Sequence, residues 1–345
     1  MKLLTYFFGL FFFVTSIHLH AQNQEVLVDS FEVSDFTLAF GSCNKHNVEN
    51  VLWDDILNTN PDVWVWGGDI IYADTDQMPK LRKFYAQQDS VPGYLALQTK
   101  VPVIGTWDDH DYGLNDGGEE FTAKKESQQE FLDFLKVAKD SPRRSQEGVY
   151  TSHNYSTPKG SIKVLVLDTR YFRTKLTADT ETKKRNKPNA YGEGTVLGSV
   201  QWEWLENELT KSTADFNVIV SSIQVLSNEH GFETWGNFPH EVDKLKKMIA
   251  DSKAKGVVLL SGDRHISEFS KAAVDGLAYP LLDFTSSGLT HTYSAYSGEP
   301  NPFRVGEVVF VISFGVLDFD FDKKQIHFKM LGDNGKVLGA LTQQY

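Results

Sequence analysis

The sequence predicts an α/β sandwich, because short apolar strands alternate with amphipathic helical stretches along most of its 345 residues. After residue 280 the pattern changes to consecutive strands. Four polar clusters directly follow apolar strands. The carboxyl ends of strands are where folds of this class bind ligands, so these clusters are the first candidates for a functional site.

The first half of the chain gives the clearest alternation of elements. Apolar runs predict strands over residues 36–40, 63–66, 101–104 and 162–167. A helix is expected over 48–57, where Asn47 can cap its start, and another over 124–139 from the spacing of its apolar residues.

The second half continues the pattern and then becomes strand-rich. Helices are expected over 201–209 and 241–250, because each places its apolar residues on one face. Strands are expected over 218–220, 257–260, 281–284, 308–314 and 326–330. The polar stretch 174–194, which contains Lys183-Lys184-Arg185, has the composition of a mobile loop.

Residues 1–21 have the pattern of a secretory signal peptide. Lys2 precedes the apolar run 3–17, and Ala21 precedes a polar sequence. The run is short for a membrane span, so we expect cleavage near Ala21, with an uncleaved anchor as the alternative. Residues 22–345 would then form one domain, periplasmic or secreted, with no membrane span after signal cleavage.

The net charge of −12 argues against a nucleic-acid-binding surface, which needs clustered positive charge. It does not argue against an anionic substrate, because a bound cation can dominate the local field.

Cys43 is the only cysteine, and it follows the strand 36–40. An exported protein with one thiol cannot form an internal disulfide. The thiol is therefore a core residue, a nucleophile or a metal ligand, unless it links two chains in a dimer. The polar residues at the other strand ends favour the ligand.

Three further clusters supply carboxylates and imidazoles. The first cluster is Gly68-Asp69-Ile70-Ile71-Tyr72. The Asp69 carboxylate can bridge two cations, and Tyr72 places a phenol three residues later; a turn or helix cap is the alternative role for Asp69. Asp108-Asp109-His110-Asp111 concentrates charge that a cation or an arginine must offset, unless it is a solvated acidic loop. In Asp263-Arg264-His265 the first and last side chains point the same way if the segment is extended; a buried structural His265 is the alternative.

The mixture of donors predicts more than one kind of metal ion. Thiolate, phenolate and imidazole suit a transition metal, and Cys43 with Tyr72 favours Fe³⁺. Carboxylate and amide oxygens suit Ca²⁺ or Mn²⁺. Two adjacent ions could hold a tetrahedral ester and lower the pKa of a bridging water, and His110 could protonate the leaving group.

These motifs together resemble the alkaline phosphatase D family of calcineurin-like metallophosphoesterases. The resemblance covers about residues 36–270 and includes Leu167-Asp168-Thr169-Arg170-Tyr171 and the segments 197–202 and 231–239. It implies a sandwich of two mixed β-sheets flanked by helices, with a centre of Fe³⁺ and Ca²⁺.

The resemblance also implies roles for individual residues. Iron would be held by Cys43, Asp69, Tyr72 and His265, and the second metal by Asp69, Asp109 and Asp263. His110 occupies the position of the catalytic histidine. Candidates for binding the substrate are Asn115, which could instead join the second metal, Arg170 and Arg264. His230 is a candidate for a further histidine of the general pattern.

The sequence therefore predicts an exported, metal-dependent hydrolase of phosphomonoesters or phosphodiesters. A sulfate-ester hydrolase acting on a sulfated polysaccharide is the alternative, because sulfate is also tetrahedral and anionic. Trp53, Trp235 and Tyr293 could line a sugar-binding cleft in that case, although a place in the buried core is the expected alternative for these aromatic residues. A non-catalytic, metal-stabilised carbohydrate-binding protein is a third hypothesis.

Overall fold

The computed structural model describes residues 34–345. The predicted signal peptide, residues 1–21, lies outside the described residues, as do residues 22–33. Among the residues that are described, no helix is both long and apolar enough to cross a membrane.

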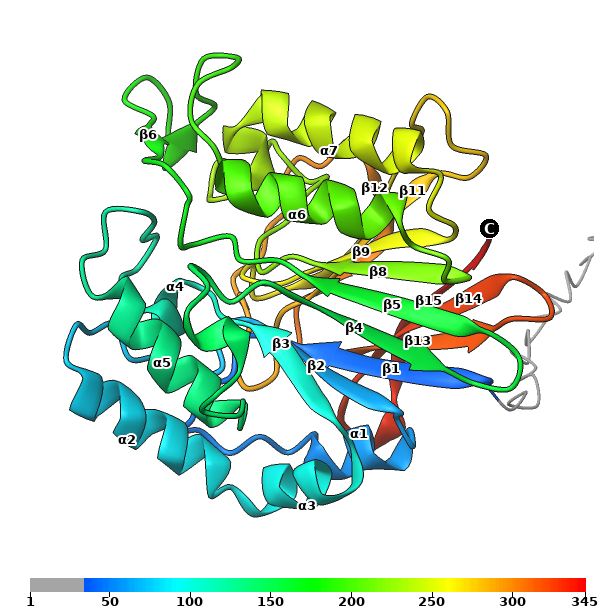
Figure 1. The fold of residues 1–345 in the computed structure, drawn as a ribbon, viewed down its shortest axis with the longest axis horizontal. Helices are drawn as coiled ribbons and strands as arrows, with labels where there is room; N and C mark the ends of the chain where they lie inside the picture. The colour runs from blue at the N-terminus through cyan, green and yellow to red at the C-terminus, as the bar shows by residue number, and fades with distance from the viewer. Residues whose placement is uncertain (1–33) are drawn as a thin grey trace, which may run out of the picture. The chain divides into compact units, whose positions relative to one another are not determined.

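Two mixed β-sheets form the centre of the described domain (Figure 1). The first sheet has six strands in the order β15-β14-β13-β1-β2-β3, with β1, β2 and β3 parallel to one another. Its strands are β1 (Phe36–Gly41), β2 (Val63–Gly67), β3 (Val103–Thr106), β13 (Phe314–Asp320), β14 (Gln325–Leu331) and β15 (Val337–Gln344).

The second sheet has seven strands in the order β12-β10-β11-β9-β8-β5-β4. Strands β5, β8, β9 and β11 run parallel, and β4, β10 and β12 are antiparallel to their neighbours. Its strands are β4 (Thr151–Ser156), β5 (Ser161–Val166), β8 (Phe216–Val220), β9 (Val257–Ser261), β10 (Ser267–Ala272), β11 (Leu281–Ser286) and β12 (Arg304–Val309).

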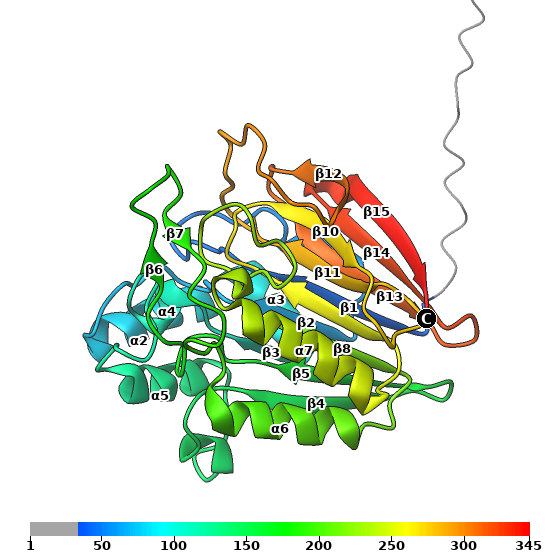
Figure 2. The same ribbon diagram turned by 90° about the horizontal axis from the view of Figure 1, so that it is seen from above.

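Helices cover the outer face of each sheet. Figure 1 shows α6 and α7 on the second sheet and α1, α2, α3 and α5 on the opposite side, against the first. The helices are α1 (Trp53–Asn58), α2 (Met78–Asp89), α3 (Pro92–Lys100), α4 (Asp109–Tyr112), α5 (Lys124–Phe134), α6 (Gly198–Thr210) and α7 (Pro239–Ser252). Both views place the short α4 and the ribbon of β6 (Thr177–Ala178) and β7 (Asn186–Lys187) at one end of the sheets (Figure 2).

The alternation of side chains in β2 explains the layers. Val63 and Val65 lie in the core between the two sheets, whereas Trp64 and Trp66 lie in the core beneath the helices. Successive side chains of a strand point to opposite faces, so one short apolar strand can supply two cores. The second sheet repeats this arrangement: Val218 and Val220 face the first sheet, and Ile219 faces α6 and α7.

The two-sheet α/β fold expected from the sequence is confirmed, with differences at the ends of elements. The expected helix 48–57 begins only at Trp53, because the Asn50 carboxamide accepts a hydrogen bond from the Leu52 amide (3.0 Å) and forms a turn. The expected strand 308–314 is divided between β12 and β13, and the helix expected to reach residue 139 ends at Phe134. The polar stretch 174–194 contains the β6–β7 ribbon.

Asp168, immediately beyond β5, joins three parts of the domain. Its fully buried carboxylate accepts hydrogen bonds from the Trp107 indole (3.0 Å) and from the amides of Val149 (2.9 Å), Arg170 (2.8 Å) and Tyr171 (2.9 Å). A single side chain therefore holds the end of β5 to the chain beyond β3 and to the start of β4.

Replacing Asp168 with Ala should lower the free energy of unfolding by about 3 kcal/mol or more, because four buried donors would lose their acceptor. Urea denaturation would measure this, with the exposed Asp275→Ala as the matched control. A loss no larger than that of the control would contradict the structural role of Asp168.

Candidate metal centre

The carboxyl ends of β1, β2, β3 and β9 bring the predicted clusters together. Cys43 and Asp69 each lie two residues beyond their strand, as does Asp263 beyond β9. Oxygen atoms of Asp69, Asp109 and Asp263 lie within 4.8 Å of one another, together with one from Asp108. Residues far apart in the sequence thus form one compact group of ligand atoms.

The backbone at these strand ends is in an unusual conformation. Four candidate ligands have left-handed backbone angles: Cys43 (φ 58°), Asp69 (φ 52°), Asp263 (φ 66°) and His265 (φ 54°). Such angles are uncommon for residues other than glycine and concentrate at functional sites. They turn each chain sharply beyond its strand.

Gly68 provides the close approach that this arrangement needs. A Cβ atom at this position would lie 2.5 Å from the Cβ of Asp108, and the backbone has a φ of 98°. Only glycine meets both conditions without displacing Asp108.

The first set of donors surrounds one oxygen of Asp69. Asp69 Oδ2 lies 3.4 Å from Cys43 Sγ and 3.1 Å from Tyr72 Oη, and Tyr72 Oη lies 3.1 Å from His265 Nε2. Ligand atoms bonded to a common ion at about 2.0–2.3 Å lie roughly this far apart. The four residues fit the ligand set of one transition-metal ion.

Burial argues against two of the alternative roles of Cys43. The residue is fully buried, and burial, followed by the charges of Asp69 and Asp263, raises the pKa of its thiol well above the usual value. A protonated thiol is a weak nucleophile, and a buried one cannot join two folded chains. These facts disfavour a nucleophile and a disulfide-linked dimer, and a metal ion would stabilise the thiolate.

The second set consists of carboxylates. Asp69 is shared with Asp108, Asp109 and Asp263, and all four are buried or nearly so. Asp108 Oδ2 and Asp109 Oδ1 are buried atoms with no hydrogen-bond partner. Unpaired carboxylate oxygens in such a place fit a cation with oxygen ligands, such as Ca²⁺ or Mn²⁺.

The pKa values reflect this concentration of charge. Burial, then the charge of Asp109, raises the pKa of Asp69, and burial is the main cause that raises the pKa of Asp263 to about 7. Burial alone would also raise the pKa of Asp109, but Arg170 and His110 outweigh it and hold that pKa below its usual value.

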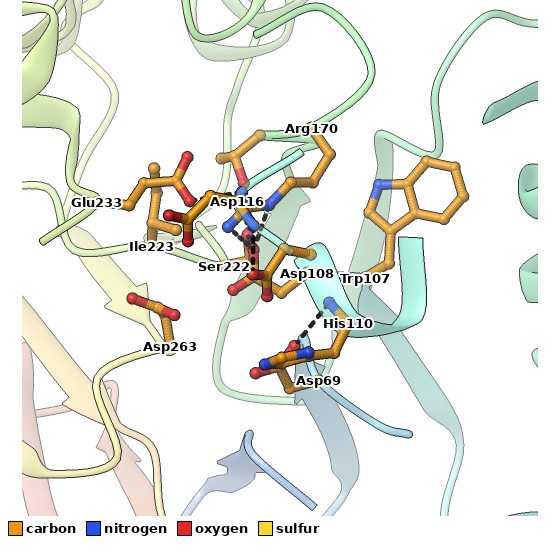
Figure 3. A network of polar contacts seen from close by, with 12 residues as sticks. Asp69, Trp107, Asp108, His110, Asp116, Arg170, Ser222, Ile223, Glu233 and Asp263 are labelled. Atoms are coloured by element: carbon orange, nitrogen blue, oxygen red, sulfur yellow. Dashed lines mark hydrogen bonds and ion pairs between the residues drawn. The ribbon is translucent and has the colours of Figure 1, made fainter. Parts of the chain in front are cut away.

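Arg170 lies within the protein beside the carboxylates (Figure 3). Its Nε donates to Asp108 Oδ1 (2.6 Å) and its Nη1 to Glu233 Oε2 (2.6 Å), and Glu233 also pairs with Arg173 (2.8 Å). The Ser222 hydroxyl donates to the same Asp108 oxygen (2.6 Å). Arg170 is fully buried and does not line the cavity described below, so its position does not support the predicted contact with substrate; it compensates the charge of Asp108 instead.

Asp111 has a structural position. Its carboxylate accepts from the Asp108 amide (2.6 Å) and the Ile70 amide (3.2 Å), which joins the ends of β2 and β3. Together with Asp108 it forms a capping box at the start of α4. This local structure aims Asp109 and His110 into the site.

His110 is held by a carboxylate that the sequence did not point to. Its Nδ1 lies 2.8 Å from Asp74 Oδ1, and its ring stacks on Tyr72 with centroids 4.1 Å apart. Burial alone would lower the pKa of His110, but the hydrogen bond to Asp74 and the charges of Asp69 and Asp109 raise it to about 10. Bound cations would offset part of that charge.

A cavity of about 480 Å³ opens beside the carboxylates. Its lining includes Asp109, His110, Asp263 and His265 and also Asn115 and Arg264, two of the predicted substrate-binding residues. Arg264 is 7% exposed, its Nη2 donates to both oxygens of Glu299 (2.9 Å each), and its Nε is buried without a partner.

His230 is placed differently from the prediction. It is buried outside the cavity lining, and its Nδ1 accepts a hydrogen bond from the Phe232 amide (3.1 Å). Burial, then the charge of Arg264, lowers its pKa to about 3. His230 supports a turn, and its position does not support a role among the metal ligands.

The sequence predicted no role for three residues near the site, although Glu233 lies in the segment 231–239 that carries the resemblance. Asp74 holds His110, Glu233 lines the cavity, and His291 packs against His265 with ring centroids 4.4 Å apart. The Nε2 atom of His291 is buried without a partner. Asp74 stands two residues after Tyr72, so its place beside a candidate ligand cluster could have indicated a role. His291 lies in the part of the chain for which only strands were predicted, and no motif there indicates a role in the site.

Comparison with known protein families assigns the chain to one of them. Residues 38–292 match the PhoD-like phosphatase family. The chain belongs to that family. The match includes the four strand-end clusters and extends beyond the region 36–270 from which the resemblance was predicted.

Individual relatives agree with the family assignment. The chain is 26% identical over 214 residues to alkaline phosphatase D of Bacillus subtilis, a match that covers 56% of this chain and 36% of that protein. The chain thus spans about a third of the length of the curated relative.

Solved structures share the fold. The structure of PhoD superposes with a TM-score of 0.71 at 20% identity, over 90% of this chain and 69% of that one. A dimetal phosphatase from Danio rerio superposes with a TM-score of 0.55 at 14% identity, over 91% of this chain and all of that one. Two mixed sheets with flanking helices are therefore the architecture of a metallophosphoesterase, and the buried Asp and His residues form a candidate metal site consistent with that class.

Replacing Arg170 with Gln should weaken the binding of Mn²⁺ or Ca²⁺ at least tenfold, because Asp108 and Glu233 would lose their buried countercharge and the segment carrying Asp109 would shift. Isothermal titration of the metal-free protein would measure the affinity. Arg82→Gln is the matched control, since Arg82 also pairs with a buried glutamate, Glu130, but neither residue lines the cavity. An affinity within twofold of wild type would contradict the role assigned to Arg170.

The stabilisation of the protein by Mn²⁺ should increase between pH 5.5 and pH 8. Asp263 must lose its proton to bind a cation, and with a pKa of about 7 it is largely protonated at pH 5.5 and ionised at pH 8. His265, with a pKa of about 4, is neutral throughout this range and adds no opposing change.

The measurement is the difference in melting temperature with and without Mn²⁺ after treatment with a chelator. Asp263→Asn should lose most of the metal-dependent shift at both pH values, and the exposed Asp275→Asn should retain it. A shift that decreases as the pH rises would show that Asp263 does not bind the metal.

Proposed function

We propose that this protein is a metal-dependent phosphoesterase that hydrolyses phosphomonoesters, phosphodiesters or both. The observation that carries the proposal is the position of Asp69 between the two donor sets. One of its oxygens contacts Cys43 and Tyr72, and the same carboxylate belongs to the group with Asp109 and Asp263. A carboxylate shared in this way can hold two cations next to each other.

We assign Cys43, Asp69, Tyr72 and His265 to Fe³⁺, and Asp69, Asp109 and Asp263 to a harder ion, Ca²⁺ or Mn²⁺. The thiol and phenol suit the first ion and the carboxylates the second. When bound, the two ions activate water and neutralise negative charge on the ester.

His110 is the candidate general acid. Asp74 occupies its Nδ1, which leaves Nε2 as the nitrogen available to a substrate, and the side chain lines the cavity. A pKa raised to about 10 in the metal-free protein keeps the ring protonated at neutral pH. The imidazolium can then give a proton to the departing alkoxide, as a general acid does.

Arg264 and Asn115 are the candidates for binding the anionic part of the substrate. Both line the cavity, where the Arg264 side chain keeps 8% of its surface exposed. Since Glu299 fixes the orientation of the guanidinium, this cation is held in place before substrate arrives.

A sulfate-ester substrate is the alternative, and the structure offers less for it. Trp53 and Trp235, considered above as part of a sugar-binding cleft, are 4% and 0% exposed and belong to the core. Tyr293 alone of the three lines the cavity. Sulfated oligosaccharides belong in the same assay panel as phosphate esters.

The site of action of the enzyme is part of the proposal. An exported protein, periplasmic or secreted, follows from the signal-peptide pattern of residues 1–21. Amino-terminal sequencing of the protein recovered from each cell fraction would test both cleavage near Ala21 and export.

Asp69→Asn should reduce turnover of phosphate esters by about a thousandfold or more, because the neutral amide cannot hold two adjacent cations. Steady-state kinetics after loading with Fe³⁺ and Ca²⁺ would measure this, alongside elemental analysis of each preparation. The control is Asp76→Asn, an exposed residue nearby that does not line the cavity. Turnover by the Asp69 variant within tenfold of wild type would refute the mechanism.

The iron-loaded protein should be coloured by charge transfer from the Cys43 thiolate or the Tyr72 phenolate. Cys43→Ser and Tyr72→Phe should each change the visible absorption band, because each removes one of these ligands. A band unchanged in both variants would contradict the assignment of iron to this set of donors.

A further inference from the structure

The cavity is larger than the group that the metals would hold. Its volume of about 480 Å³ lies within the range of ~300–1,000 Å³ typical of sites for small organic molecules. Its lining also contains two aromatic side chains, Phe232 and Tyr293.

Both aromatic residues contact the segment 263–265, which carries two candidate metal ligands. The Arg264 guanidinium lies 4.2 Å from the centre of the Phe232 ring, and the Tyr293 amide donates to the His265 carbonyl (2.8 Å). Phe232 and Tyr293 therefore stand directly beside Asp263 and His265.

The two rings are also accessible. Phe232 is 36% exposed and Tyr293 38% exposed, whereas most large aromatic residues of the described domain are buried. An isolated exposed aromatic residue needs no explanation, but two of them in the lining of one polar cavity do.

The turn that presents Phe232 is held by several contacts. Gly231, with a φ of 84°, packs so closely that a Cβ atom there would lie 2.5 Å from the Cβ of Lys184. The Gly231 carbonyl accepts from the Asn186 amide (2.8 Å), and the Phe232 amide donates to His230 (3.1 Å). Such a turn keeps the ring in place without a ligand, which lowers the entropy cost of binding one.

A second arginine and an acidic residue belong to the same cavity lining. Arg185, which extends the β6–β7 ribbon, lines the cavity and pairs with Asp116 (2.7 Å) while its side chain remains 55% exposed. The Asp116 amide donates to Asp109 Oδ2 (2.7 Å), so this pair is also tied to a candidate metal ligand. The wall thus combines exposed aromatic rings with guanidinium groups, the combination that binds flat aromatic rings by stacking and cation–π contacts.

We propose that Phe232 and Tyr293 form a leaving-group subsite that selects phosphate esters whose leaving group carries a flat aromatic ring, such as a nucleobase. This inference rests on the proposed phosphoesterase function and adds the class of leaving group to it. The ester phosphorus would lie at the carboxylates, and the ring of the leaving alcohol would lie against Phe232 and Tyr293.

The experiment compares two esters with primary alkoxide leaving groups, thymidine 5′-phosphate and glycerol 1-phosphate, so that the intrinsic reactivity of the leaving group is similar. We expect the ratio of kcat/KM for the nucleotide over the glycerol ester to fall about tenfold or more in Phe232→Leu/Tyr293→Leu, mainly through KM. Leucine keeps the apolar bulk and removes the rings. The single variant Phe232→Tyr keeps both rings and should keep the wild-type ratio. Tyr191 is an exposed tyrosine outside the cavity lining, so Tyr191→Leu should also leave the ratio unchanged.

A second measurement does not depend on turnover. Free thymidine should inhibit hydrolysis of glycerol 1-phosphate competitively in the wild-type protein. The inhibition constant for thymidine should be at least tenfold higher in the double variant Phe232→Leu/Tyr293→Leu. Glycerol should not inhibit at the same concentrations.

The outcomes separate failure of the subsite from failure of the proposed function. If the wild-type protein hydrolyses both esters but the double variant keeps the wild-type ratio, or thymidine does not inhibit, the subsite is wrong and the phosphoesterase proposal stands. If the metal-loaded wild-type protein hydrolyses neither ester nor their diesters, the proposed function fails, and the subsite fails with it.

Discussion

The concentration of buried carboxylates at the strand ends is the constraint on which the site depends. Asp69, Asp108, Asp109 and Asp263 place oxygen atoms within 4.8 Å of one another, and the fully buried Arg170 pairs with Asp108 of this group. Two like charges about 4 Å apart repel by roughly 4 kcal/mol at an effective dielectric constant of ~20. Arg170 and a protonated His110 carry two positive charges against four carboxylates, so the arrangement requires metal ions or bound protons as well.

The fold supplies the rigidity that keeps these carboxylates together. The strands that carry them are buried on both faces, against the other sheet and against helices, so the strand ends cannot move apart without opening two cores. The left-handed backbone at Asp69 and Asp263 then turns each side chain toward the common point. The strain and the repulsion are local, and the packing that offsets them is spread through the domain.

The sequence predicted best what depends on local rules. Cys43, Asp69 and Asp263 were identifiable because each follows an apolar strand and glycines stand beside them, and the structure brings them together. The position of Arg170 could not be predicted in this way. An arginine that follows a strand gives the same local sequence pattern whether it faces substrate or is buried against Asp108 and Glu233. That distinction depends on contacts between residues more than 60 positions apart in the chain.

The candidate metal ligands and the cavity wall are built from different kinds of structure, and this bears on specificity. The candidate ligands follow the ends of strands in two sheets, whereas Phe232 and Tyr293 stand on connecting segments that touch the site through Arg264 and the His265 carbonyl. Connecting segments can change in sequence without disturbing a sheet, so the wall can vary while the metal chemistry is retained. Membership of a phosphatase family therefore informs the reaction, and the residues of the wall are where the choice of leaving group must be sought.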